Sequence, residues 1–520
     1  MKTFEAKKKR NNGIKRLIFC GISIILEFIV SLSFITNLNT YAEILNILTR
    51  ITATILVLDI YSRNTTSTIK TPWIIIILVA PVLGVSLYFF TGLNSTTRKM
   101  KMRYEKIDNI LLPQLPAENT VSEEIYNVSK GAGGISKYIY NFSRYPAYRN
   151  RELKYFSDAS DALEAMKNDL AKAEKFIFME YFAIENKETW MSIQKILEQK
   201  VKEGVEVRVF YDDIGSIGFV NLDFINQLKS VGIQCRVFNP FMPFVNMFLN
   251  NRDHRKLTVI DGKTGYTGGY NLANEYFNIT HPYGKWKDTG IRFEGEAVLS
   301  LTATFLEMWN AVKESDIDDQ HPEKYLVCDN ISGCFSSDNG FIQPYADSPI
   351  NGEQLGESVY ISILNKADRY CWFMTPYLVI TDEMINAFSL AAKRGVDVRI
   401  ITPGIPDKKA VYRLTKSFYS TLVGNGVRIF EWTPGFCHAK MCISDDIIAT
   451  CGTINLDYRS LYHHFENSCL MINCDAVNDI KNDFIHTFNE CTEVTRIYSE
   501  PGRKRLRIGQ MILRMFAELF

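Results

Sequence analysis

The chain has 520 residues, of which 46% are apolar, and a formal net charge of +1 at pH 7. That length supports two large domains with cores of their own, and the balanced charge gives no global electrostatic reason for nucleic-acid binding. Its eleven cysteines are odd in number and scattered along the chain. They predict reduced thiols and exclude a small disulfide-stapled scaffold.

Hydrophobic segments dominate the N-terminal region. Residues 17–35 are long enough to cross a membrane and carry one charge, Glu27, while residues 73–90 form an uncharged run. Between them, residues 42–61 are apolar but carry three charges, so they form either a third span or an interfacial helix. A cleaved signal peptide is disfavoured because Glu27 interrupts the apolar stretch. We therefore expect a membrane anchor of two or three helices over residues 1–93.

Residues 94–150 connect this anchor to the main part of the chain, and we interpret them as a linker. Residues 131–134 read Gly-Ala-Gly-Gly but lack the lysine of a nucleotide-binding loop, so they predict a flexible turn. At the other end of the chain, residues 501–520 combine a basic stretch with a following apolar pattern. This pattern predicts a basic amphipathic helix that lies either on a membrane or against a domain.

The central part of the chain repeats itself. Residues 202–209 match residues 393–400 almost position by position, and residues 231–238 are answered by residues 425–430. Each member of the first pair has the pattern of a helix end, a Gly stop and a β-branched strand. Such self-similarity predicts two structural units of the same kind.

Helices and strands are predicted at matching places in the two repeats. Apolar residues recur at helical spacing over residues 190–201, and Thr381 is predicted to cap a helix over residues 384–391. Apolar runs over residues 176–184 and 370–380 predict core strands before these helices.

Strands that alternate with helices imply an α/β fold. We expect two similar lobes, each a sheet flanked by helices, over residues 151–325 and 326–500, preceded by the N-terminal transmembrane anchor. The acidic stretch over residues 314–323 is predicted to be a surface connection between the lobes.

The pattern His-x-Lys-x-x-x-x-Asp occurs twice, in a chain with seven histidines. The two copies are His254, Lys256 and Asp261, and then His438, Lys440 and Asp445. Small residues and an asparagine follow each copy: Gly268, Gly269 and Asn271 in the first, and Gly452, Thr453 and Asn455 in the second. One copy of so short a pattern is more often a structural histidine. Duplication with matching downstream residues favours a functional pair.

The residue types indicate the chemistry. Residues i and i+2 of a strand project to the same face, so the side chains of each His and its Lys are expected to lie on the same side of the strand. An ammonium group beside an imidazole suits a phosphate, because the Lys steadies equatorial oxygens while the His attacks or protonates an axial one. The glycines allow backbone to approach closely, and the amides of Asn271 and Asn455 have N–H groups to donate to phosphate oxygens. The pattern therefore predicts phosphodiester chemistry through a phosphohistidine.

A metal centre is disfavoured, because the residue two positions after each motif histidine is a cation and not a ligand. We therefore expect neither a metal nor a cofactor. The remaining histidines lack such a partner set and are interpreted as structural: His281, His321, His463, His464 and His486.

The paired motifs and the repeat resemble the phospholipase D superfamily, and the chain from about Trp73 onward resembles the bacterial cardiolipin synthases of that superfamily. Residues 266–273 after the first motif, residues 455–460 after the second, and the anchor carry this resemblance. It implies that both motifs form one active site across an internal pseudo-two-fold axis. A Ser often stands at the positions of Gly269 and Thr453, so a hydroxyl contact is expected to be missing from the first half-site.

By the same resemblance, an acidic residue on the strand after each motif orients the imidazole of that motif. The matching positions are Asp288 and Glu466. Asp261 and Asp445, although part of the motifs, then look like turn or support residues and not proton acceptors. The phosphate-binding positions are Gly269, Asn271, Thr453 and Asn455.

The resemblance implies reversible phosphatidyl transfer from one phosphatidylglycerol to another, giving cardiolipin and glycerol, with His254 as nucleophile and His438 as acid and then base. The near symmetry of the half-sites does not rank the two histidines. Two alternatives use the same site: a phospholipase D-type hydrolase that releases phosphatidic acid, and a phosphatidylserine synthase-like transferase with a nucleotide-linked donor. The anchor and the balanced charge disfavour a nuclease, and two complete half-sites disfavour a non-enzymatic membrane scaffold.

The expected partners are phosphatidylglycerol and membrane lipid, without nucleic acid, and the oligomeric state is left open. Basic residues flank the anchor on both sides: Lys2, Lys7, Lys8, Lys9, Arg10, Lys15 and Arg16 before it, and Arg98, Lys99, Lys101, Arg103 and Lys106 after it. Both flanks face inward if the number of spans is even. Together with reduced thiols, this predicts a multi-pass protein of the cell membrane with cytoplasm-facing lobes. Residues 241–249 either admit acyl chains or form a buried lobe contact.

Overall fold

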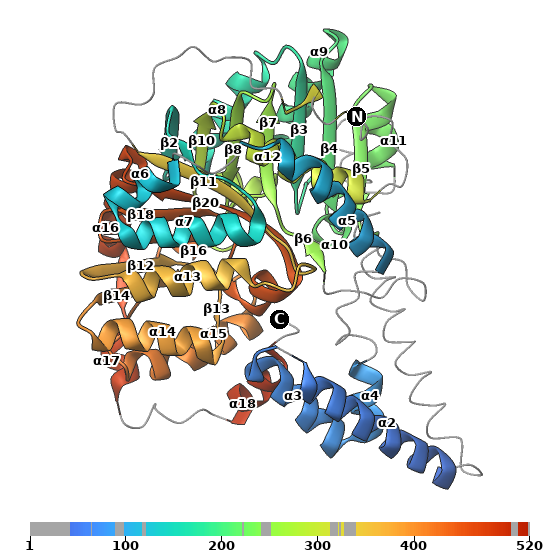
Figure 1. Ribbon diagram of the computed structural model, residues 1–520, viewed down its shortest axis with the longest axis vertical. Coiled ribbons are helices and arrows are strands. Elements are labelled where there is room, and N and C mark those ends of the chain that lie inside the picture. Colours follow the sequence, from blue (N-terminus) through green and yellow to red (C-terminus); the bar gives the residue numbers. More distant parts are fainter. Residues whose placement is uncertain are drawn as a thin grey trace.

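Two α/β lobes make up most of the protein (Figure 1). The computed structural model describes residues 42–63, 65–88, 98–116, 121–220, 223–240, 251–312, 321, 324–326, 340–500 and 508–517. The predicted hydrophobic stretch over residues 17–35, the apolar stretch over residues 241–249 and the basic residues 503–507 lie outside this part. The acidic connection also falls mostly outside it.

The first lobe is built on a seven-stranded sheet in the order β2-β10-β8-β7-β3-β4-β5. In chain order its strands are β2 (Glu152–Phe156), β3 (Phe176–Tyr181), β4 (Glu206–Asp212), β5 (Gln234–Phe238), β7 (Lys256–Ile260), β8 (Thr264–Gly268) and β10 (Gly290–Glu294). Strands β3, β4 and β5 run parallel, and β7, β8, β10 and β2 pair antiparallel.

Helices cover both faces of this sheet, so its central strands are buried on both sides. The helices are α8 (Ala159–Leu170), α9 (Glu188–Lys202), α10 (Asp213–Ser216), α11 (Phe224–Ser230) and α12 (Val298–Ala311). Alternate residues of β3 divide between two cores: Phe178 packs with α12, whereas Ile177 and Met179 pack with α8 and α9. Every residue of α12 is buried, which places this helix in the middle of the molecule.

The second lobe repeats the strand order of the first. Its strands are β11 (Phe341–Asp347), β12 (Tyr370–Met374), β14 (Asp397–Pro403), β15 (Arg428–Trp432), β17 (Met441–Ser444), β18 (Ile448–Gly452), β20 (His464–Ile472) and β21 (Cys491–Glu493). The order β11-β20-β18-β17-β12-β14-β15 corresponds strand for strand to the first sheet. This equivalence confirms the two-lobed α/β fold.

Five helices accompany the second sheet: α13 (Leu355–Lys366), α14 (Asp382–Lys393), α15 (Lys409–Val423), α16 (Asp475–Asn489) and α17 (Thr495–Ser499). Thr381 caps α14 as predicted, since its side chain accepts a hydrogen bond from the N–H of Met384 at 3.1 Å. The apolar run over residues 370–380 divides into β12 and the short β13 (Leu378–Val379), which pairs with β19 (Leu456–Asp457).

The segment before the first lobe is folded. It contains α5 (Arg98–Leu111), α6 (Val121–Val128), α7 (Lys130–Ser143) and β1 (Tyr148–Arg149), and β1 extends the sheet of the second lobe beside β11. The prediction of a flexible turn at residues 131–134 was wrong, because these residues lie inside α7. A Cβ at Gly133 would come within 2.7 Å of the Cα of Tyr126, so a glycine allows α6 and α7 to touch.

Three helices form the described part of the N-terminal region: α2 (Ala42–Ser62), α3 (Ser67–Val79) and α4 (Pro81–Leu87). The run over residues 73–90 is not one straight helix, because Pro81 starts a new helix after α3 has ended. Within the residues that the structure describes, no helix combines the length and the apolar character needed to cross a bilayer. These helices lie toward the second lobe, and the side chain of Thr66 donates to Glu383 of α14 at 2.9 Å (Figure 1).

Candidate active site

Two short strands cross between the lobes and deliver the motif histidines. β6 (Arg252–Asp253) belongs to the first repeat but pairs in parallel with β20 of the second lobe. β16 (Gly435–Cys437) belongs to the second repeat but pairs with β9 (Lys285–Lys287) of the first. The N–H of His254 donates to the carbonyl of Phe465 at 2.8 Å, and the N–H of His438 donates to the carbonyl of Lys287 at 2.7 Å. Each histidine is therefore held by backbone of the opposite lobe.

The acidic partners cross in the same way. Nδ1 of His254 lies 2.9 Å from both carboxylate oxygens of Glu466, and Nδ1 of His438 lies 2.7 Å from Oδ2 of Asp288. The expectation that each acid orients the imidazole of its own repeat was wrong. Glu466 directly follows Phe465, and Asp288 directly follows Lys287, so the ladder that holds each histidine also places its carboxylate. A carboxylate at Nδ1 fixes the ring proton there and leaves the lone pair on Nε2.

The two lysines lie beside these rings. Nζ of Lys256 donates to the carbonyl of His254 at 2.7 Å. Nζ of Lys440 donates to the carbonyl of His438 and lies 2.8 Å from Nδ1 and 3.1 Å from Nε2 of the same ring. Burial lowers the pKa of Lys256 to about 7 and that of Lys440 to about 8, although Glu466 and Asp288 act in the opposite direction. Burial therefore disfavours the charged form of both lysines, and an anion bound beside them would stabilise that charge.

Burial also governs the two imidazoles. It lowers the pKa of His438 to about 3, with a further contribution from the charge on Lys440. It lowers the pKa of His254 well below the usual value, and Lys256 adds to that effect. In the free protein both rings are neutral at neutral pH, so Nε2 of His254 has a lone pair for nucleophilic attack.

The downstream asparagines lie at equivalent places but in different surroundings. Oδ1 of Asn271 accepts the N–H of Ala183 at 3.1 Å, and its Nδ2 donates to the hydroxyl of Tyr276 at 2.8 Å. Oδ1 of Asn455 is buried and has no hydrogen-bond partner among the described residues. Each Nδ2 carries two hydrogens, so the amide of Asn271 keeps one N–H for a ligand.

The difference between Gly269 and Thr453 follows from the length of the neighbouring acid. The hydroxyl of Thr453 lies within hydrogen-bond distance of the Glu466 carboxylate and of the carbonyl of Asn467, the latter at 3.0 Å, and has one hydrogen to donate to either. A Cβ at Gly269 would lie 2.1 Å from Oδ1 of Asp288. Aspartate is one carbon shorter than glutamate, so the Asp288 carboxylate occupies the space that a side chain would need. The first half-site therefore lacks the hydroxyl contact.

Asp261 and Asp445 do not join the histidines. Asp261 directly follows β7 and Asp445 directly follows β17. Both adopt the left-handed conformation, with φ of 55° and 57°. Their carboxylates each accept three backbone N–H groups: those of Glu174, Lys175 and Phe176 for Asp261, and those of Asp368, Arg369 and Tyr370 for Asp445. They join the turn to the start of β3 or β12, which is a supporting position.

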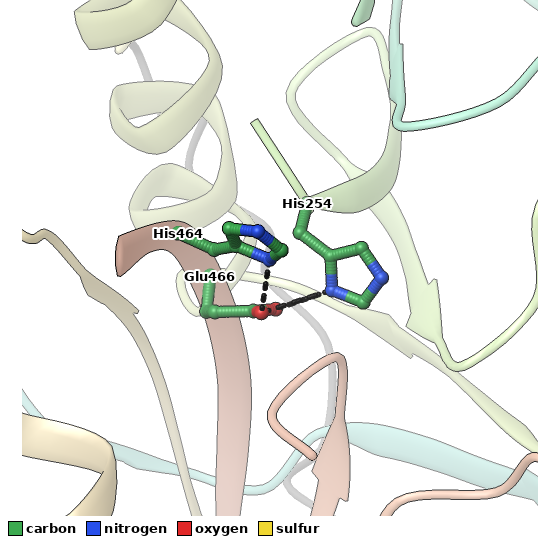
Figure 2. Close-up of side chains that lie close together, drawn as sticks. All are labelled: His254, His464 and Glu466. Carbon is green, nitrogen blue, oxygen red and sulfur yellow. Dashed lines mark hydrogen bonds and ion pairs between the residues drawn. The ribbon is translucent and has the colours of Figure 1, made fainter. Parts of the chain in front are cut away.

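His464 lies in the site, although its sequence context led us to interpret it as structural. Its ring centroid is 5.4 Å from that of His254, and its Nδ1 is 3.7 Å from Oε1 of Glu466 (Figure 2). The sequence does contain a signal for it: His464 stands two residues before Glu466 on a strand, so both side chains project to one face. The same offset from Asp288 leads to Trp286, whose ring lies 5.3 Å from that of His438.

Aromatic side chains close the walls around both imidazoles. Phe182 lies 5.0 Å from His254, and Tyr276 and Phe436 lie 5.2 Å and 5.8 Å from His438. The two half-sites therefore differ: the ring of His254 faces a second imidazole, whereas the ring of His438 is surrounded by aromatic groups. Exclusion of water strengthens the electrostatic interactions of the lysines and carboxylates inside.

Comparison with known proteins agrees with this arrangement. The family described as "Cardiolipin synthase, PLD-like domain" matches residues 166–309 and 360–488, which are more than half of the chain. A second family, "Phospholipase_D-nuclease N-terminal", matches residues 51–92.

Whole-chain relatives show the same likeness. The chain is 41% identical over 447 residues to an uncharacterized protein of Streptococcus mutans, covering 86% of this chain and 95% of that protein. It is 31% identical over 454 residues to a cardiolipin synthase of Clostridium perfringens, with 86% and 93% covered. The solved phosphatidylserine synthase of Haemophilus influenzae shares the fold, with a TM-score of 0.56, 14% identity, and 74% and 98% of the two chains covered. The chain therefore belongs to the phospholipase D-like family of cardiolipin synthases.

Proposed function

We propose that this protein transfers a phosphatidyl group from one phosphatidylglycerol to the terminal hydroxyl of another, giving cardiolipin and glycerol through a phosphohistidine. The observation that carries this proposal is the pair of crossed histidine–carboxylate contacts, each backed by a buried lysine. They supply one nucleophile, one proton carrier and two cationic groups, the set that transfer of a single phosphodiester group requires. Family membership supports the choice of lipid.

In the first step Nε2 of His254 attacks phosphorus, and the bond from phosphorus to the glycerol oxygen breaks. His438 gives its proton to that oxygen. The negative charge of the bound phosphodiester, together with Asp288, restores the proton affinity that burial takes from His438. Lys256 and Lys440 stabilise the negative charge that develops on the phosphoryl oxygens.

In the second step His438, now neutral, accepts the proton of the terminal hydroxyl of a second phosphatidylglycerol. The hydroxyl oxygen attacks phosphorus, the N–P bond to His254 breaks, and cardiolipin leaves. Because donor and acceptor carry the same glycerol headgroup, the reaction is reversible in the same site. Asn271 and Asn455 are positioned to donate to the phosphoryl oxygens.

The surroundings of the two rings favour His254 as the nucleophile. Nε2 of His254 makes no hydrogen bond within the described part of the chain, whereas both ring nitrogens of His438 contact Nζ of Lys440. A lone pair on Nε2 of His438 that accepts a hydrogen bond from the Lys440 ammonium group is less available for attack on phosphorus. Brief incubation with phosphatidylglycerol, acid-free digestion and mass spectrometry should find the phosphatidyl group on His254. Label on His438 would reverse the assignment.

The acceptor separates this proposal from its strongest alternative. The purified full-length protein is incubated with phosphatidylglycerol vesicles in the presence of a chelator, and the lipids are identified by mass spectrometry. We expect cardiolipin with equimolar glycerol, no product with His254→Ala, and full activity with the exposed His486→Ala as a matched control. Phosphatidic acid without cardiolipin would mean that water is the acceptor. Product formed only from a nucleotide-linked lipid would indicate the phosphatidylserine synthase-like reaction.

The same proposal places the N-terminal region in the cell membrane and the lobes on the cytoplasmic side. The hydrophobic segments with their basic flanks support it. The described native cysteines are buried except Cys491, which is partly buried. An added cysteine at exposed Lys393 is compared with the unmodified protein, whose labelling gives the background from all native cysteines. In intact cells, Lys393→Cys should resist an impermeant thiol reagent. Labelling without cell breakage would place the lobes outside.

A further inference from the structure

Three potential ligands gather on one side of the candidate active site. His254, His464 and Glu466 each offer one atom, and these atoms lie within 4.8 Å of one another. Both imidazoles turn a nitrogen toward the Glu466 carboxylate, at 2.9 Å for His254 and 3.7 Å for His464 (Figure 2). The three side chains come from β20 and from the residue after β6, which are paired strands, so the backbone ladder holds them together.

Nδ1 of His464 is the unusual atom of this group. It is buried and has no hydrogen-bond partner among the described residues, because 3.7 Å to Glu466 is too long for a hydrogen bond. Its other nitrogen, Nε2, accepts a hydrogen bond from Nε of Arg459 at 3.3 Å. Burying an unpaired polar nitrogen costs free energy, which a ligand at that atom would recover.

The donor set matches the preferences of one metal ion. Two imidazoles and a carboxylate, with the fourth position open, are a ligand set that zinc uses in proteins, with zinc–nitrogen distances of about 2.0–2.1 Å. A metal ion binds the neutral form of an imidazole and the ionised form of a carboxyl group.

We propose that His254, His464 and Glu466 bind a zinc ion reversibly, and that this ion competes with the phosphodiester for the site. The ammonium groups of Lys256 and Lys440 lie nearby and repel a divalent cation. The ion is therefore an exchangeable inhibitor and not a resident cofactor. Metal binding stands independently of the proposed function, whereas inhibition rests on it.

The inhibition follows from the protonation of one ring. In the free protein the carboxylate of Glu466 holds the proton of His254 on Nδ1, which leaves the lone pair on Nε2. A zinc ion bound to Nδ1 takes that position, so the neutral ring keeps its single proton on Nε2. The lone pair needed for attack on phosphorus is then absent. Glu466 coordinates the ion and no longer orients the ring.

Binding is tested on the full-length protein in detergent, after metals have been stripped and without lipid. Zn²⁺ is titrated by calorimetry, and Co²⁺ serves as a coloured probe of the ligand set. We expect one ion per chain and the strong visible absorption of a four- or five-coordinate cobalt site. His464→Phe should weaken binding by a factor of about 100 or more, because a direct ligand contributes at least as much as an outer-shell partner. His486→Phe, which alters an exposed His–Glu pair, is the matched control and should bind as the unmodified protein does.

A second variant has the opposite expected sign. Zinc at Nδ1 of His464 moves the ring proton to Nε2, where the guanidinium of Arg459 now donates. Arg459→Met removes that donor and a positive charge, so it should tighten metal binding.

The proposal is overturned if His464→Phe binds Zn²⁺ as tightly as the control, or if Arg459→Met weakens binding. Because the titration contains no lipid, a failure of the zinc site leaves the transfer reaction untouched. A failure to make cardiolipin likewise leaves the binding result standing.

Discussion

At the scale of single residues, the two half-sites are related by symmetry but are not copies. Gly269 and Thr453 hold equivalent positions, and the acid beside each decides which residue fits. Asp288 has a shorter side chain than Glu466, and its carboxylate lies where a side chain at position 269 would be. Only glycine therefore fits at position 269. Glu466 is longer and leaves space for a hydroxyl that donates to it.

This difference predicts opposite responses to the same residue. Gly269→Ser places a side chain where Oδ1 of Asp288 lies, so His438 loses its orienting carboxylate. We expect the transfer rate to fall by a factor of about 100 to 10,000, the usual contribution of a general acid and base. Thr453→Ser keeps the hydroxyl and should retain most of the activity. Rates with phosphatidylglycerol vesicles and far-ultraviolet circular dichroism measure activity and folding, and a fully active Gly269→Ser would refute this account.

At the scale of elements, the turns after β7 and β17 explain the last residue of each motif. Asp261 and Asp445 adopt positive φ and satisfy three N–H groups each at the start of the neighbouring strand. Both carboxylates therefore contact backbone at the far end of the strand from the motif histidines.

Substitution at these turns should therefore affect stability and not catalysis. Asn tolerates positive φ but replaces one acceptor oxygen by an amide nitrogen. We expect Asp261→Asn and Asp445→Asn each to lower the free energy of unfolding by about 0.5–1.5 kcal/mol, the usual net contribution of a hydrogen bond, because these turns are partly exposed. Denaturant unfolding followed by fluorescence measures this. Transfer by the folded variants should stay near the original rate, so loss of activity in a fully folded Asp445→Asn would show a catalytic role.

At the scale of the whole molecule, a residue inside the first motif joins distant parts of the chain. Arg255 stands between His254 and Lys256 but points away from the site. It donates to the carbonyl of Thr304 in α12 at 3.0 Å and to the hydroxyl of Tyr104 in α5 at 2.8 Å. It also lies 3.6 Å from the Glu307 carboxylate, so the helix before the lobes is tied to the strand that carries the lysine.

Removing this buried cation should destabilise the protein as a whole. We expect Arg255→Met to lower the free energy of unfolding by about 3–5 kcal/mol, because buried acidic groups lose their partner. Arg428→Met, which breaks a partly exposed pair with Glu493, is the control and should cost less than about 1 kcal/mol. Thermal unfolding of both variants makes the comparison. Equal losses would mean that Arg255 contributes no more than a surface ion pair.

Local patterns along the chain were enough to predict the repeated α/β units, the strands and helices within them and the pair of motifs. These features depend on local periodicity, capping and duplication, as the Thr381 cap shows. Which acid contacts which histidine depends instead on the packing of the two lobes, since β6 and β16 each pair with a strand of the opposite lobe.

The same applies to His464, which reaches the site because β20 aligns it with a strand more than two hundred positions earlier. Local glycine content likewise misled us at residues 131–134, where helix contact outweighs intrinsic preference. The periodicity of apolar residues indicates on which face of its own strand or helix a side chain lies. The register between two separately folding sheets is set by packing across their interface, and no single stretch of sequence contains that information.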